Sequence, residues 1–174
     1  SSLAELWKAK KTAVQVYVHG TTAADDLDTT RLGWLMDALI ADGDFWITSF
    51  GELMAYMRAS HYPSAQNGLV WSPDSTSATP YYGGKQCAFV FSTDDGNARN
   101  VDYDVVMAAK GDLHWTAFIV PDWIGDAGKL TSAQVLALHE GGLCEIGCHS
   151  FDHPLLIDSE GCSVSSASAT PKAI

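Results

Sequence analysis

Residues 86–96 have the sequence Gln-Cys-Ala-Phe-Val-Phe-Ser-Thr-Asp-Asp-Gly. The apolar, β-branched and aromatic run over 86–92 predicts a buried strand, which ends directly in two carboxylates followed by glycine. Adjacent carboxylates repel one another unless a shared proton or a cation relieves the repulsion, and a divalent metal supplies that relief. The alternative interpretation is an ordinary Asp-Gly turn, because such turns are common at strand ends.

The chain on both sides of this stretch alternates short apolar strands with helices. Further strands are predicted over 13–18, 45–48, 113–120 and 143–148, and helices over 3–10, 31–41, 50–59 and 131–140. Thr29 or Thr30 is expected to cap the second helix, and Thr131 the last one. Because strands alternate with helices, the sequence predicts an α/β fold with a parallel sheet or barrel, in which chemistry lies at the carboxyl ends of the strands.

A single domain is expected, since 174 residues with 47% hydrophobic and 18% charged side chains can bury a core of their own. Residues 60–84 are rich in Ser, Pro, Gly, Asn and Thr, which predicts a linker. Residues 158–174 predict a poorly ordered tail. Cys87, Cys144, Cys148 and Cys162 permit two disulfides without requiring them, and no Cys-x-x-Cys pair indicates a structural zinc ribbon.

The charge balance narrows the class of partner. With 21 acidic and 10 basic residues the net charge is −11, which argues against nucleic acid and anionic membranes and favours a neutral substrate. No apolar run reaches the ~18–20 residues that a membrane span needs.

Two histidines follow the strand predicted over 143–148. His149 and His153 are four residues apart, so on a helical turn they would share one face and could bind one metal ion. A surface pair, or a capping histidine before Pro154, is the alternative. Two histidines with one of the aspartates of 94–95 would leave an open position for water, which is the pattern of catalytic rather than structural zinc.

The other histidines are weaker candidates. His19 follows the strand over 13–18, and this place at a strand end makes it a candidate general acid, although a lone histidine there is more often structural. His61, His114 and His139 are interpreted as structural or surface residues.

Several of these segments resemble motifs of the polysaccharide deacetylase family (NodB homology, carbohydrate esterase family 4). Residues 92–96, Ser-Thr-Asp-Asp-Gly, resemble its first motif, Thr-Phe-Asp-Asp-Gly, and residues 149–154, His-Ser-Phe-Asp-His-Pro, match every position of its second, His-Ser/Thr-x-x-His-Pro. Residues 116–120 resemble the strand between the two motifs and 130–142 the following helix, while His19 resembles the last motif and 44–57 the final strand and helix. The resemblance covers residues 1–59 and 86–156.

The resemblance implies roles for five residues. Asp95, His149 and His153 would hold a divalent metal, zinc first and cobalt or nickel as alternatives; Asp94 would be the general base and His19 the proton donor to the leaving group.

The implied activity is hydrolysis of acetyl groups on a carbohydrate, either N-acetyl groups of a chitin-like or peptidoglycan-like glycan or O-acetyl groups of xylan. Because such polymers lie outside the cytoplasm, an extracellular or periplasmic location is expected. Trp71, Tyr81, Tyr82 and Trp123 could stack on sugar rings, although core packing is the more frequent use of such residues.

The chain departs from the family in order and in extent. The His19 segment comes first instead of last, which predicts a circular permutation with residues 60–84 joining the usual ends; a fragment of two neighbouring units, or a chain assembled from ordered pieces, is the alternative. No Arg-x-Pro motif is present.

Five strands predict a distorted or incomplete (β/α) barrel with an exposed edge, which a partner chain or a homo-oligomer could cover. Two further readings stay open: a non-catalytic glycan-binding or assembly module on a degenerate scaffold, and an amide hydrolase acting on a non-sugar substrate.

Overall fold

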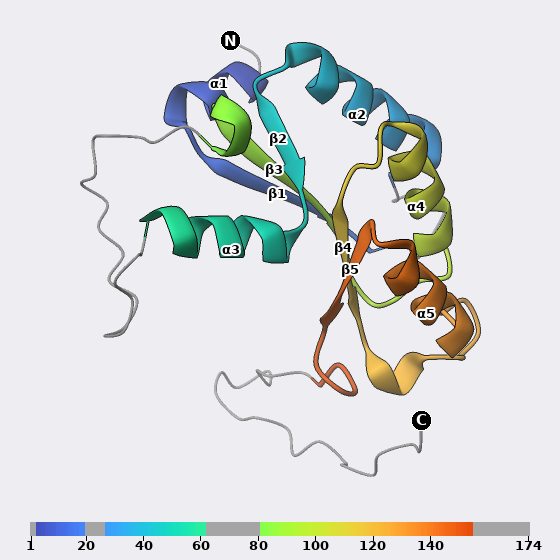
Figure 1. The fold of residues 1–174 in the computed structure, drawn as a ribbon. Helices are drawn as coiled ribbons and strands as arrows, with labels where there is room; N and C mark the ends of the chain where they lie inside the picture. Colours follow the sequence, from blue (N-terminus) through green and yellow to red (C-terminus); the bar gives the residue numbers. More distant parts are fainter. Residues whose placement is uncertain (1–2, 20–26, 62–80, 155–174) are drawn as a thin grey trace, which may run out of the picture.

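The computed structural model describes residues 3–19, 27–61 and 81–154, so most of the predicted linker and the whole predicted tail lie outside the described residues. Five parallel strands form one sheet (Figure 1): β1 (Ala13–Val18), β2 (Phe45–Thr48), β3 (Cys87–Thr93), β4 (Trp115–Ile119) and β5 (Cys144–Cys148). The helices are α1 (Leu3–Lys10), α2 (Thr29–Asp42), α3 (Phe50–His61), α4 (Asn100–Ala109) and α5 (Ser132–Gly141), with short 3-10 turns η1 (Tyr82–Gly84) and η2 (Pro121–Trp123). None of the described helices combines the length and the hydropathy needed to cross a membrane.

Strand β3 is the centre of the sheet. β1 pairs with it along its whole length, from Ala13 opposite Ala88 to Val18 opposite Thr93. Its other edge is shared, because β2 pairs with residues 87–90 and β4 pairs only with Ser92 and Thr93. β5 follows beyond β4. Within the described residues no pairing joins β5 or β2 back to β1, so the parallel α/β sheet is confirmed but is open; barrel closure and permuted order stay predictions.

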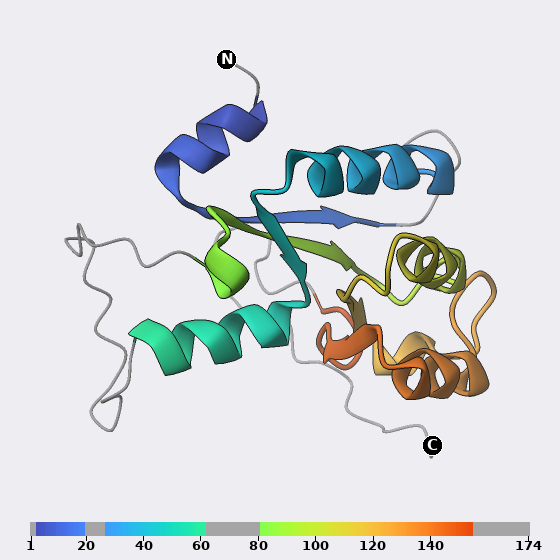
Figure 2. The same ribbon diagram turned by 45° about the horizontal axis from the view of Figure 1, so that its top comes forward.

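Both faces of β3 are covered, which explains its unbroken apolar sequence. Phe89 and Phe91 lie in a large core with residues of α2, α4 and β4: Leu32, Met36, Tyr103, Met107 and Trp115. On the opposite face Ala88 and Val90 pack against Leu53 of α3. Figure 2 shows α2 and α3 on opposite sides of the sheet.

Cys87 and Cys144 are buried free thiols and Cys148 is an exposed one, while Cys162 lies outside the described residues.

The N-caps of α2 and α5 can be compared with the caps predicted from the sequence. α2 begins two residues earlier than predicted because Asp28, and not Thr29 or Thr30, is its N-cap: the Asp28 carboxylate accepts a hydrogen bond of 2.8 Å from the backbone N–H of Arg31. At α5 the predicted cap is confirmed, since Thr131 and Gln134 form a reciprocal capping box. Gly142 ends α5 in the left-handed conformation, with φ 80°.

Helix α4 was not predicted from the sequence. Its N-cap residue, Arg99, makes no side-chain capping hydrogen bond, so the usual start signal is absent. The helix buries Asn100, Tyr103 and Met107, a spacing of three and four residues that includes a polar side chain. This mixture of polar and apolar residues on the buried face weakened the periodic signal.

The start of α3 is fastened to β4 and β5 by polar contacts. The backbone N–H of Gly51 donates to Glu145 Oε2 at 2.7 Å, and the Thr116 hydroxyl donates to the same oxygen at 3.0 Å while it accepts from the N–H of Phe50 at 2.8 Å. A carboxylate at a helix N-terminus satisfies free N–H groups and complements the helix dipole. A β-carbon at residue 51 would overlap the Glu145 carboxylate, so a larger residue there would have to displace that carboxylate from the start of α3.

We therefore expect Thr116→Val to lower the free energy of unfolding by about 1–3 kcal/mol, because valine fills the same buried volume but leaves the Phe50 N–H without an acceptor. Urea denaturation measures the change. Thr30→Val, an exposed position in the first turn of α2, is the matched control and should change stability by less than about 0.5 kcal/mol. Equal effects of the two substitutions would contradict the role of the Thr116 hydroxyl.

Candidate metal and catalytic site

The carboxyl ends of three strands of the sheet carry the polar residues singled out in the sequence. His19 directly follows β1, Asp94 and Asp95 follow β3, and His149 follows β5. The backbone N–H of Asp94 donates to Val18 O at 3.0 Å, and that of His149 donates to Ile119 O at 2.8 Å. The strand pairing therefore continues one residue past the strands and holds these residues at one edge of the sheet.

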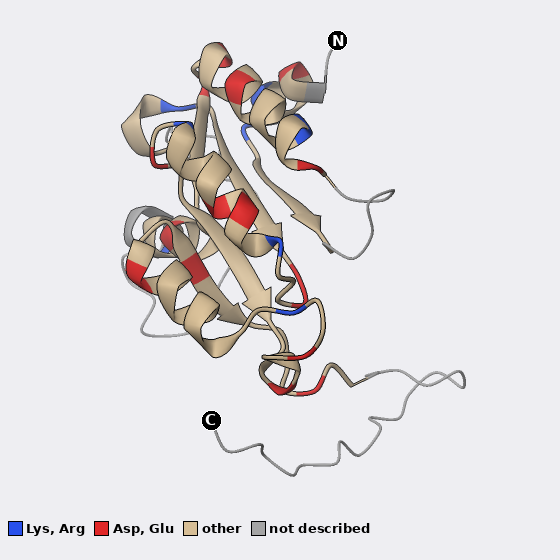
Figure 3. Ribbon diagram, turned by 90° about the vertical axis from the view of Figure 1, so that its right-hand side faces the viewer, with Lys and Arg blue, Asp and Glu red and all other residues tan. Residues whose placement is uncertain are grey.

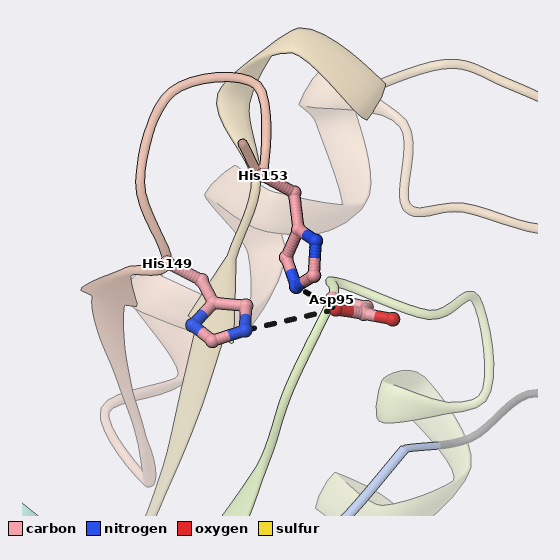
Figure 4. A group of neighbouring side chains, drawn as sticks. All are labelled: Asp95, His149 and His153. Carbon is pink, nitrogen blue, oxygen red and sulfur yellow. Dashed lines mark ion pairs between the residues drawn. The ribbon is translucent and has the colours of Figure 1, made fainter. Parts of the chain in front are cut away.

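Asp95, His149 and His153 lie together. Asp95 Oδ1 is 3.8 Å from His149 Nε2 and 3.6 Å from His153 Nε2, and the candidate ligand atoms of all three residues lie within 4.8 Å of one another. Figure 4 shows both imidazole rings with a nitrogen directed at the Asp95 carboxylate. The structure thus brings together the three predicted metal ligands.

The turn after β3 directs the Asp95 side chain. Asp95 and Gly96 both have left-handed backbone angles, with φ 71° and 65°. Aspartate tolerates this region better than most residues. A β-carbon on Gly96 would lie 3.1 Å from Ile119 Cγ2, so the turn packs closely against the end of β4. This packing fixes where Asp95 leaves the sheet.

The segment 149–153 is not the helical turn that the spacing predicted. Ser150 and His153 have positive φ values of 60° and 53°, and the segment forms bends with no helix. The Ser150 hydroxyl accepts a hydrogen bond of 3.1 Å from the His153 N–H, and Phe151 O accepts one of 3.0 Å from the N–H of Asp122. Pro154 disfavours the helical conformation at the residue before it. The two imidazoles converge through this folded loop.

The donor set fits a divalent cation. Asp95 is only 12% exposed, and its buried Oδ1 has no hydrogen-bond partner among the described residues, although both imidazoles face it. A buried carboxylate oxygen without a partner is costly. Two imidazole nitrogens and one carboxylate oxygen suit zinc and other metals of borderline softness, and three protein ligands leave a coordination position open. The metal would occupy the side of Asp95 that now lacks a partner.

Asp94 lies in a different environment from its neighbour. Its Oδ2 is 3.9 Å from His19 Nε2, and it does not belong to the three-residue cluster. The Asp94 side chain is 16% exposed and that of His19 is 51% exposed, so the imidazole stands on the open side of the pair. The two adjacent aspartates therefore face different partners, and only one of them faces the histidine pair.

Lys129 and Trp123 also lie at the cluster. Lys129 Nζ is 3.7 Å from Asp95 Oδ2 and 4.4 Å from the centre of the Trp123 ring, and that ring is 5.1 Å from the ring of His153. From the sequence, Trp123 is only a sugar-stacking candidate, and Lys129 is not a candidate site residue. Nothing in the sequence marks Lys129, because its proximity to Asp95 depends on the path of the loop before α5.

His114 and His139 lie apart from the cluster, in agreement with their interpretation as structural or surface residues. His114 precedes β4, and its Nδ1 is 2.6 Å from Glu52 Oε1. Burial acts to raise the pKa of Glu52, but hydrogen bonds from Thr48, Ser49 and His114 outweigh it, so the pKa is lowered. His139 is exposed on α5, and the side chain of His61 lies outside the description.

Comparison with known proteins places the fold. Two similar solved structures are the deacetylase PplD of Streptococcus pyogenes in complex with acetate, with TM-score 0.53 and 14% identity, and the de-N-acetylase of Aggregatibacter actinomycetemcomitans, with TM-score 0.51 and 17% identity. This chain therefore shares its fold with part of these two deacetylases. The match covers 85% and 86% of this chain but only 59% and 58% of those chains, so this chain spans less than two thirds of their length. No family model and no curated protein matches the sequence.

We expect the protein to bind one zinc ion per chain, and Asp95→Asn and His153→Ala each to weaken binding by more than about 100-fold. Loss of a residue that only orients a ligand costs 10–100-fold, and loss of a ligand should cost more. Competition with a chromophoric chelator measures the affinity. His139→Ala, which removes an exposed imidazole on α5, should bind zinc as the wild type does. Unchanged binding by both site variants would show that the metal lies elsewhere.

Proposed function

We propose that the protein is a metal-dependent hydrolase that removes acetyl groups from a carbohydrate: N-acetyl groups of a chitin-like or peptidoglycan-like glycan, or O-acetyl groups of xylan. The observation that carries the proposal is the arrangement at one sheet edge of a three-ligand cluster beside a separate carboxylate–imidazole pair. The similarity in fold to two deacetylases supports it.

Asp95, His149 and His153 would hold the cation. When bound, a divalent metal supplies Lewis-acid chemistry, because it lowers the pKa of a water molecule and polarises an acyl carbonyl. Holding the cation on one carboxylate leaves the second, Asp94, free to act on protons. Asp95 would therefore bind the metal and Asp94 would transfer protons, because the two side chains point in different directions.

Asp94 and His19 would carry the proton transfers. The Asp94 carboxylate would accept a proton from the attacking water, whose oxygen bonds to the acyl carbon. His19 would then donate a proton from Nε2 to the leaving nitrogen or oxygen as the bond to the acyl carbon breaks, which yields acetate and a free amine or hydroxyl. The exposure of His19 suits this role, because the leaving group belongs to a polymer that must approach from solvent.

Surface charge supports an uncharged glycan. Acidic segments lie along the helices and in the loops at the carboxyl ends of the strands, with few basic ones among them (Figure 3). The net charge of −11 would repel a strongly anionic polymer. Since acetylated structural polysaccharides lie outside the cytoplasm, the proposal includes an extracellular or periplasmic location.

A second candidate is a non-catalytic glycan-binding or assembly module. It is favoured by the lack of an Arg-x-Pro motif among these 174 residues and by the place of the His19 segment ahead of the other two motifs. In that case the open edges of β1 and β5 would receive a partner chain or a second copy. The two candidate functions differ in the expected effect of Asp94→Asn, which should abolish turnover in an enzyme and change nothing in a binding module.

We expect acetate release from acetylated oligosaccharides, its loss on chelation, and its return with zinc. Asp94→Asn should lower kcat by about 10²–10⁴-fold while zinc binding is kept, because the substitution removes a proton acceptor and not a metal ligand. Coupled acetate detection over N-acetylated and O-acetylated oligosaccharides and a non-sugar acetamide measures both rate and substrate class, with His139→Ala as the control. Activity that resists chelation would contradict the metal-dependent mechanism. A zinc-loaded wild type without turnover would favour the non-catalytic module.

A further inference from the structure

We propose that Lys129 is the resident counter-cation of Asp95 in the metal-free protein, and that it thereby limits how tightly the site holds a divalent metal. This inference rests on the proposed function, because it concerns the same site. It assigns a positioning and charge-setting role to a residue outside both sequence motifs.

The two oxygens of Asp95 face different groups. Oδ2 is 3.7 Å from Lys129 Nζ, whereas Oδ1 faces the imidazoles of His149 and His153 at 3.8 and 3.6 Å. The ammonium group is thus placed on the side of the carboxylate that the metal would not use. With Oδ2 held in this way, Asp95 presents a single oxygen to the cluster.

Backbone hydrogen bonds hold Lys129 next to Asp95. The N–H of Leu130 donates to Gly96 O at 2.9 Å and that of Ala98 donates to Gly128 O at 3.0 Å, on either side of an antiparallel bridge between Asn97 and Lys129. Lys129 is therefore fixed beside the turn that carries Asp95. A surface lysine that met the carboxylate by chance would lack this attachment.

Trp123 holds the ammonium group from the other side. Lys129 Nζ lies 4.4 Å from the Trp123 ring centre, a cation–π distance, and the Lys129 side chain is only 18% exposed. The same ring lies 5.1 Å from that of His153, with an interplanar angle of 32°. Asp95, Lys129, Trp123 and His153 thus form a closed set of contacts, in which the counter-cation and one imidazole ligand share an aromatic neighbour.

The charge of Lys129 is expected to lower the affinity of the cluster for a divalent metal. In the metal-free protein, Lys129 supplies the positive charge that the poorly exposed Asp95 carboxylate needs. A divalent cation at the cluster would meet that carboxylate already partly neutralised, and would be repelled by an ammonium group of the same sign nearby. Lys129 therefore stabilises the metal-free form more than the metal-bound form, which weakens metal binding.

The test compares Lys129→Met, which keeps the length of the side chain but removes its charge, with Lys129→Arg, which keeps the charge. Zinc affinity is measured by chelator competition, and the melting temperature is measured in chelator and in saturating zinc. The matched control is Lys110→Met, which removes the same charge from the ion pair with Asp37, where Nζ and Oδ1 are 2.6 Å apart.

We expect Lys129→Met to bind zinc about tenfold more tightly than the wild type, and Lys129→Arg and Lys110→Met to stay within about threefold of it. Lys129→Met should melt below the wild type in chelator and close to it in zinc, whereas any loss of stability in Lys110→Met should be equal in both conditions. Unchanged or weaker zinc binding by Lys129→Met, or an equal loss of stability with and without zinc, would overturn the inference alone. A wild type that takes up no zinc would overturn both the inference and the proposed function.

Discussion

The parallel pairing of β3 with the strands beside it is the constraint on which the site depends. Val18 lies opposite Thr93, Thr93 lies opposite Ala117, and Ile119 lies opposite Cys148. These registers place His19, Asp94 and His149 one residue beyond the ends of three strands that run in the same direction. Because side chains alternate between the faces of a sheet, a slip of one residue in any pairing would turn a ligand or a proton-transfer group to the opposite face.

The same pairing explains how an open sheet can carry a complete cluster. The residues around Asp94 and Asp95 come from the segments that follow β1, β4 and β5, and these strands form with β3 an unbroken series of neighbours. β2 pairs with the first half of β3, and the first two residues of α3 donate hydrogen bonds to Thr116 and Glu145, away from the cluster. Closure of a barrel is therefore not a requirement for bringing the three ligands together.

Much of this arrangement could be predicted from the sequence, because local signals agree with the fold. The five strands are short apolar runs bounded by polar residues, and α5 carries a complete capping box at Thr131 and Gln134. Where the signal was mixed, the prediction was wrong or missing: α4 buries Asn100 beside apolar residues, and three possible cap residues stand in a row at 28–30. The helical turn predicted to bring the candidate ligands His149 and His153 together is wrong, because left-handed residues in a loop bring the two imidazoles together instead. Lys129 was out of reach of the sequence because only the bridge between two loops places it.

The doublet of carboxylates after β3 shows how local backbone geometry separates two chemical roles. Adjacent aspartates in a regular strand would point to opposite faces of the sheet. Here Asp94 still pairs through its backbone with β1, while Asp95 has already entered the left-handed region, and this change of conformation sends the two side chains to different partners. Asp94 faces an exposed imidazole, and Asp95 faces two imidazoles and an ammonium group. Their mutual repulsion is thus offset by separate positive or metal-binding neighbours, which is the condition under which one carboxylate can hold a cation while the other stays available for protons.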